Sequence, residues 1–183
     1  MASLTSTLQV FALLGHNGAG KTTTINMLTG MYTTTSGDAA LGSMFVSTDL
    51  HRMQGVLGVC PQHDVLFPDL TVAEHLRIMA RVKGVPNAEI EDALAEIIAL
   101  VGITEKVNSQ TQGLSGGQKR KLSISMALIG NSELVFLDEP TSGVDPYSRL
   151  RSMWEVIRRA KKDRVIVLTT HFMDEVTAAH MTM

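Results

Sequence analysis

The sequence predicts an α/β protein in which a mostly parallel sheet is flanked by helices and interrupted by an inserted helical subdomain. Short, continuously apolar runs alternate with segments of helical periodicity, which is typical of buried parallel strands. Between residues 63 and 130 the apolar residues recur only at helical spacing. Because no linker, charge block or repeat divides the 183 residues, we expect one domain over residues 1–183. Its core would come from residues 1–61 and 131–183, and residues 62–130 would form the helical subdomain.

Four apolar runs are predicted to be strands because each is too short for a helix. They are residues 8–14, 56–60, 134–137 and 165–169. Gly15 ends the first run and Pro61 ends the second, and both residue types break a strand.

Helical periodicity and capping residues predict five helices. Thr71 and Glu74 form a capping box before one of them, Gly102 ends the next, and Ser115 caps the third. Asp145 and Pro146 are a typical start for the last helix. The expected helices are residues 21–28, 72–84, 90–101, 115–129 and a segment from 145 whose buried stripe is Leu150, Met153, Trp154 and Ile157.

Composition excludes several classes of protein. Apolar residues make up 44% and charged residues 19%, as in globular domains, and the net charge of −2 gives no reason to expect a nucleic-acid partner. Cys60 is the only cysteine, so the chain has no internal disulfide. No apolar run approaches the roughly 18 residues that a membrane span needs.

Residues 15–22, GHNGAGKT, fit the phosphate-loop pattern G-x-x-x-x-G-K-[ST] between a predicted strand and a helix. Glycines let consecutive backbone N–H groups point at phosphate oxygens, and the helix presents its positive end to the same anion. Lys21 adds a mobile charge, and the Thr22 hydroxyl can ligate Mg²⁺. The predicted fold is therefore a P-loop NTPase, with nucleotide held by Gly15, Asn17, Gly18, Ala19, Gly20, Lys21, Thr22 and Thr23.

The run at 134–137 ends in two acids, Asp138 and Glu139, and Pro140 then stops the strand. Both acids should emerge at the carboxyl edge of the sheet, where open α/β sheets bind ligands. We expect Asp138 to hold Mg²⁺ together with Thr22, and Glu139 to orient or deprotonate the attacking water.

A second anion site is predicted where residues 114–118, LSGGQ, open a helix. Paired glycines weaken a helix start, and the three cations of residues 119–121 oppose the helix dipole. Both features are explained if the helix start faces a phosphate, through Ser115, Gly116, Gly117 and Gln118.

These residues resemble the nucleotide-binding domains of ABC transporters, for which LSGGQ is the signature, and the resemblance extends from residue 8 to 175. It implies that Gln62 contacts Mg²⁺ and the attacking water, and that His171 contacts the γ-phosphate. Residues 142–145 resemble the family's D-loop. The residues within and around these motifs are most similar to those of the eukaryotic A subfamily, whose members mostly move lipids. Bacterial drug and polysaccharide exporters share parts of these motifs.

The resemblance implies an ATPase that uses ATP and Mg²⁺, at the cytoplasmic face of a membrane. Its expected partners are transmembrane domains outside this sequence and a second nucleotide-binding domain, joined head to tail. Two alternatives remain: a soluble ABC ATPase of translation or DNA repair, and a truncated module without catalysis. The family's first antiparallel strands, its adenine-stacking aromatic residue and its last strands have no counterpart here. We therefore expect a fragment or a truncated gene model that binds ATP about tenfold or more weakly than a full domain.

Overall fold

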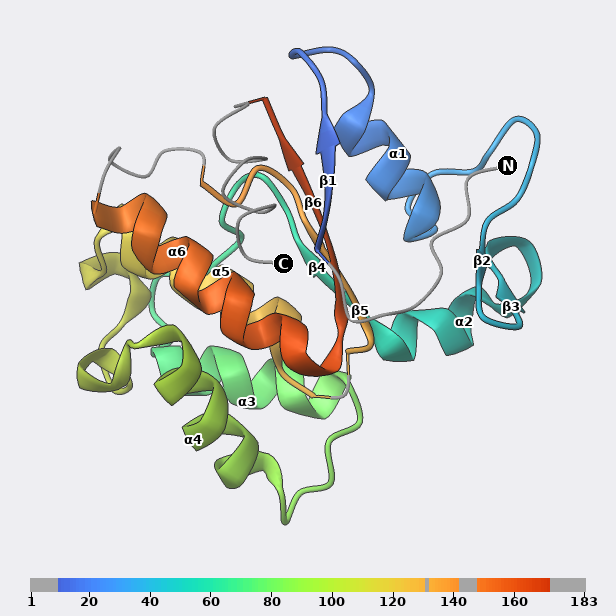
Figure 1. Cartoon of the computed structure of the whole chain (residues 1–183). Coiled ribbons are helices and arrows are strands. Elements are labelled where there is room, and N and C mark those ends of the chain that lie inside the picture. The colour runs from blue at the N-terminus through green and yellow to red at the C-terminus, as the bar shows by residue number, and fades with distance from the viewer. Residues whose placement is uncertain (1–9, 131, 142–147, 172–183) are drawn as a thin grey trace.

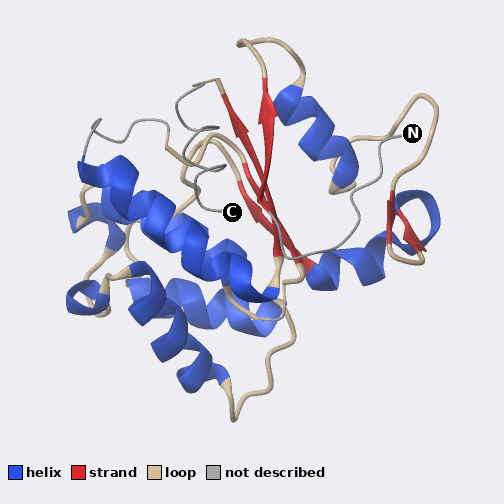
Figure 2. Cartoon of the chain, in the orientation of Figure 1, coloured by secondary structure: helices blue, strands red, loops and turns tan. Residues whose placement is uncertain are grey.

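The computed structural model describes residues 10–130, 132–141 and 148–171. Its centre is a four-stranded sheet in the order β1 (Val10–Leu14), β6 (Val165–Thr170), β5 (Leu134–Leu137) and β4 (Leu57–Cys60). All three neighbouring pairs are parallel, with Phe11 opposite Val167 and Phe136 opposite both Val167 and Val59. The predicted parallel sheet is confirmed, and helices cover both of its faces (Figures 1 and 2).

Alternate residues of the strands face two separate cores, as the period of a β-strand requires. Val135 and Leu137 of β5 belong to the larger core, which also contains apolar side chains of α3 (Val72–Val82), α4 (Ile90–Val101), α5 (Gly116–Leu128) and α6 (Ser148–Ala160). Phe136 belongs to the smaller core, beside Ile25 of α1 (Lys21–Leu28) and Met53 of α2 (Val46–Val56). The sheet therefore separates α1 and α2 from the other four helices (Figure 1).

The helices between β4 and β5 begin and end within two residues of the predicted bounds. Thr71 and Glu74 complete a capping box at α3, and Ser115 and Gln118 complete another at α5. Gly102 ends α4 in the left-handed conformation. Apolar side chains from all three helices enter the larger core, in which α5 packs against β4 and β5 while α3 and α4 pack against α5.

Two features of residues 31–56 were not predicted. A short antiparallel hairpin pairs β2 (Ala40–Leu41) with β3 (Met44–Phe45), and α2 follows with a non-helical residue, Asp49, inside it. Short 3₁₀ helices span Thr104–Lys106, Thr111–Gly113 and Lys161–Asp163.

In the predicted stripe of α6, Met153, Trp154 and Ile157 are buried. The side chain of Leu150, the helix start at 145–146 and the D-loop at 142–145 lie outside what the structure describes.

The sheet gathers four loops at one edge. Each of its strands ends there, so Gly15, Gln62, Asp138 and His171 follow four different strands and lie close together. Gly15 N–H donates to Thr170 O, and Asp138 N–H donates to Cys60 O, which ties neighbouring strand ends to each other. In the described part of the chain, no helix has the length and apolar character to cross a membrane.

Candidate nucleotide-binding and hydrolysis site

The loop between β1 and α1 has the shape of an anion cradle. Gly18 and Gly20 have φ of 83° and 88°, the left-handed conformation that glycine adopts without strain. Gly20 is the N-cap of α1, and no side chain caps that helix start. The first N–H groups of α1, from Lys21 to Thr23, therefore point from the helix end without intrahelical acceptors, as a phosphate group requires.

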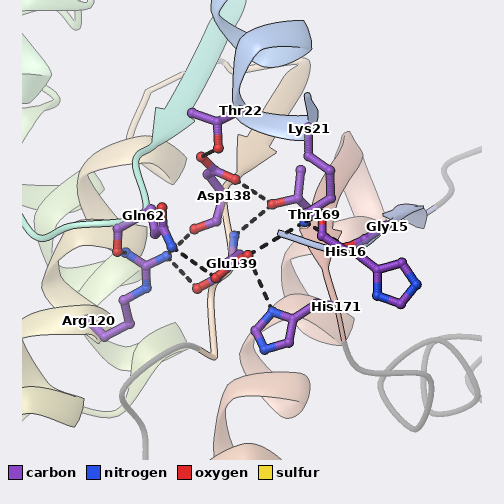
Figure 3. Close-up of polar contacts among 10 residues, drawn as sticks. All are labelled: Gly15, His16, Lys21, Thr22, Gln62, Arg120, Asp138, Glu139, Thr169 and His171. Atoms are coloured by element: carbon purple, nitrogen blue, oxygen red, sulfur yellow. Dashed lines mark hydrogen bonds and ion pairs between the residues drawn. The ribbon is translucent and has the colours of Figure 1, made fainter. Parts of the chain in front are cut away.

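Lys21 folds back over this loop. Its Nζ donates to Gly15 O at 2.8 Å and to His16 O at 3.2 Å, and it lies 3.8 Å from Glu139 Oε1. The ammonium group thus stands between the phosphate loop and the acid that follows β5 (Figure 3).

Asp138 lies opposite the start of α1. Its carboxylate accepts a hydrogen bond of 2.7 Å from Thr22 Oγ1 and another from Thr169 Oγ1 in β6. Asp138 is only 3% exposed, whereas Thr22 is exposed. The two predicted magnesium ligands are therefore neighbours at the mouth of the site, and their oxygens are the hard ligands that Mg²⁺ prefers.

Glu139 is the point at which the catalytic candidates meet. Its Oε2 accepts from Gln62 Nε2 at 3.0 Å, and its Oε1 lies 3.3 Å from His171 Nδ1. Among the described residues, Glu139 alone has a positive φ without being glycine, at 44°, a conformation that costs about 1–2 kcal/mol. Its N–H donates to Thr169 Oγ1. Sequence reasoning missed Thr169, whose signal was a polar residue at the end of a buried strand.

One of the three cations near the start of α5, Arg120, is buried. The residue is only 2% exposed, and its side chain points toward the loops after β4 and β5. Its guanidinium donates to backbone oxygens of two loops, as Figure 3 shows in part. The acceptors are Pro61 O, Gln62 O, Asp138 O, Glu139 O and Pro140 O, and Asp64 Oδ1 is also in contact.

The second helix start is closed by its own side chains in this structure. Gln118 Oε1 accepts from Ser115 N–H at 2.9 Å, and Ser115 Oγ accepts from Gln118 N–H at 3.4 Å. The N–H groups of Gly116 and Gly117 follow in the first turn of α5. In the described part of the chain, no hydrogen bond or ion pair joins residues 115–118 to the phosphate loop, so the role of this helix start as an anion site stays a prediction. In the ranges that the structure describes, no group of three or more His, Cys, Asp or Glu gathers as a metal centre.

The comparisons with known proteins agree with this geometry. Residues 5–142 match the family model described as "ABC transporter".

The chain belongs to the ABC transporter family.

Among its ABC relatives, human "Phospholipid-transporting ATPase ABCA3" is 51% identical over 167 residues, which are 91% of this chain and 10% of that protein. Human "Retinal-specific phospholipid-transporting ATPase ABCA4" is 47% identical over 91% of this chain and 7% of that protein. The chain thus spans a tenth or less of the length of these curated relatives. A solved structure titled "Structure of ATP binding subunit of ABC transporter" superposes with a TM-score of 0.80 at 29% identity, over 92% of this chain and 70% of that one.

Proposed function

We propose that this chain is an ATP-binding cassette that hydrolyses ATP to drive transmembrane transport, with lipids as the cargo. The observation that carries the proposal is the convergence of Lys21, Gln62, Asp138, Glu139 and His171 at one edge of a parallel sheet. These residues come from the start of α1 and from the three loops after β4, β5 and β6, and together they supply a phosphate-binding cation, a cation-binding acid and an anchored carboxylate. The cargo rests on the names of the relatives, two of which are phospholipid-transporting ATPases.

The phosphate loop and α1 would hold the nucleotide. Left-handed Gly18 and Gly20 expose backbone N–H groups, and Lys21 is within reach of the same space. The residues assigned to this role are Gly15, Asn17, Gly18, Ala19, Gly20, Lys21, Thr22 and Thr23.

Thr22, Asp138 and Gln62 would hold Mg²⁺, which supplies charge neutralisation at the phosphates when it is bound. The donor set fits this ion, because Mg²⁺ sites in nucleotide enzymes combine one or two protein oxygens with substrate phosphates and water. Thr22 Oγ1 and Asp138 Oδ2 are already 2.7 Å apart. Gln62 uses its amide nitrogen on Glu139, and its amide oxygen is the atom available to the cation.

Glu139 would act as the general base or the water-orienting group. Gln62 and His171 contact its two carboxylate oxygens and thereby fix its orientation. The carboxylate is buried and stands beside Lys21, so a water molecule between it and a bound phosphate would be held in a defined place.

Two partner surfaces are part of the proposal. Residues 115–118 would complete the nucleotide site of a second cassette in a head-to-tail pair, since α5 begins far from the chain's own phosphate loop in Figure 1. The transmembrane domains would dock at the cytoplasmic face of the membrane on the helical subdomain, residues 62–130. There Val65 and Phe67 are 70% and 63% exposed, and Phe67 N–H donates to His75 Nε2, which holds the loop in place.

The test is phosphate release from ATP by the 183-residue chain, with Mg²⁺ and with a chelator, beside the Glu139→Gln variant. We expect Mg²⁺-dependent hydrolysis that Glu139→Gln slows by roughly 10²–10⁴, the usual contribution of a positioned base, while nucleotide affinity is retained. Glu96→Gln, on an exposed position of α4, is the matched control and should keep the wild-type rate. Nucleotide binding without hydrolysis at any protein concentration would instead favour a non-catalytic module.

A further inference from the structure

Arg120 makes six polar contacts with the loops at the carboxyl edge of the sheet. Its Nη1 donates to the loop after β4, and its Nη2 and Nε donate to the loop after β5. Figure 3 shows Arg120 beside Gln62, Asp138 and Glu139. The distances are 2.6 Å to Pro61 O, 3.2 Å to Gln62 O, 3.3 Å to Asp64 Oδ1, 2.6 Å to Asp138 O, 3.0 Å to Glu139 O and 3.0 Å to Pro140 O. A planar guanidinium can serve two loops at once in this way, whereas a lysine ammonium is a single point of charge.

The two loops are those that carry Gln62 and Glu139, the amide and the acid that are hydrogen-bonded to each other. The backbone of Glu139 is fixed on both sides, because its N–H donates to Thr169 Oγ1 and its carbonyl accepts from Arg120. Glu139 has a φ of 44°, a backbone conformation that a residue other than glycine adopts only where its surroundings enforce it. Arg120 belongs to those surroundings, although it does not touch the carboxylate.

Arg120 is also part of α5, whose first residue follows Ser115 directly. A helix transmits a displacement of its start along its axis, because its backbone hydrogen bonds make it stiff. A shift or rotation at residues 115–118 therefore moves the guanidinium, and with it the carbonyls of Gln62 and Glu139. The Arg120 side chain therefore connects residues 115–118, through α5, to the backbone of Glu139 in the same chain.

We infer that Arg120 is a positioning residue that couples the signature segment, residues 115–118, to the orientation of Gln62 and Glu139. The inference rests on the proposed function. Engagement of the signature segment by the nucleotide of a second cassette would be read through Arg120 at the chain's own hydrolytic site. Each site would then reach its working geometry only when the other is filled.

Hydrogen exchange tests the positioning role without any need for hydrolysis. In Arg120→Met, amides of residues 60–64 and 138–141 should exchange at least about tenfold faster than in the wild type. Arg120→Lys keeps the charge and most of the volume, and it should show the same local change; it also serves if Arg120→Met does not fold. Arg164→Met is the control, since Arg164 Nη1 donates to Leu128 O at the opposite end of α5. It should leave exchange of both loops at the wild-type level.

Kinetics test the route through Glu139. Arg120→Lys should lower the turnover number about tenfold to a hundredfold at saturating ATP, with nucleotide affinity within about threefold of the wild type. In a Glu139→Gln background the same change should cause no further loss, because both act through one group.

Unchanged exchange of both loops in a folded Arg120 variant would overturn the inference, as would an undiminished loss in the Glu139→Gln background. A wild-type chain that binds no ATP, or that binds it without hydrolysis, would overturn the proposed function instead. Exchange would still report on Arg120 in that case.

Discussion

Gln62 Nε2 donates a hydrogen bond of 3.0 Å to Glu139 Oε2, although the two residues are 77 positions apart in the chain. The bond joins the loop after β4 to the loop after β5, and these strands are neighbours in the sheet. His171, after the next strand, contacts the other oxygen of the same carboxylate. Residues that follow three adjacent strands thus meet at one carboxylate, so the orientation of Glu139 depends on the sheet as well as on its own loop.

Lys21→Ala should weaken nucleotide binding. The charge-assisted hydrogen bond from an ammonium to phosphate contributes roughly 1.5–3 kcal/mol, which corresponds to about ten- to a hundredfold in affinity. Calorimetric titration with ATP measures the change. Lys162→Ala, at the exposed basic end beyond α6, removes the same charge elsewhere and should bind as the wild type does. Equal affinity of both variants would contradict the assignment of residues 15–23 to the phosphates.

Ser115→Arg should abolish hydrolysis and spare nucleotide binding by the single chain. A bulky side chain at the start of α5 would prevent contact with a second cassette, while the phosphate loop is untouched. In the wild type, hydrolysis per molecule should rise with protein concentration, because two identical patches must meet. Asn108→Arg adds the same side chain at an exposed position of the helical subdomain and should remain active. A monomer whose specific activity is independent of concentration would rule out this pairing.

Gly58→Ala should destabilise the fold. A Cβ at this position of β4 would lie 2.1 Å from Ala127 O of α5 and 3.2 Å from Val135 Cγ2, so α5 would have to move off the sheet. Overpacking of this kind costs roughly 1–3 kcal/mol. Urea unfolding measures the loss. Gly55→Ala in α2 is the control, because its Cβ would meet nothing within 4 Å and alanine favours a helix; it should be as stable as the wild type or more so.

Lys83 gives the protein a pH-dependent stability. Burial, with Arg164 nearby, lowers its pKa from 10.5 to about 8. Between pH 8 and 10.5 the unfolded chain holds the proton and the folded chain releases it, so stability should rise with pH in this window. Below pH 8 the cost of burying the charge is fully present. The gain has an upper limit of roughly 3 kcal/mol.

The measurement is the free energy of unfolding in urea from pH 7.5 to 10, compared with Lys83→Met. The variant should lack the rise, although it loses hydrogen bonds from Lys83 Nζ to Ala127 O and Ser132 Oγ at every pH. Lys162→Met, an exposed control, should keep the wild-type slope. Parallel curves for wild type and Lys83→Met would mean that Lys83 titrates alike in the folded and unfolded chains.

Elements with strong local signals were predictable from the sequence. Helix α5 begins after Ser115 because a capping box is a local arrangement, and β5 is a run of four apolar residues before two acids. The hairpin of β2 and β3 has only two residues in each strand, and α2 contains a non-helical residue, so neither left a clear periodicity. Their structure depends on neighbours in space.

The candidate site divides in the same way. The phosphate loop and Asp138 could be derived from motifs, since the residues of each motif are consecutive in the sequence. Gln62 and His171 were assigned only through the family resemblance, and the fold then placed both on Glu139. The direction of Arg120 could not be derived, because it is decided by two loops about 60 and 20 residues away in sequence.

Five of the six acceptors around Arg120 are main-chain oxygens. Main-chain atoms are common to every amino acid, so the arginine recognises the path of the two loops and is indifferent to most of their side chains. Substitutions at Gln62 or Glu139 can therefore remove a functional group and leave the scaffold beneath it in place. The chemistry of this edge can drift during evolution, or be redesigned, while the connection between α5 and the sheet is inherited unchanged.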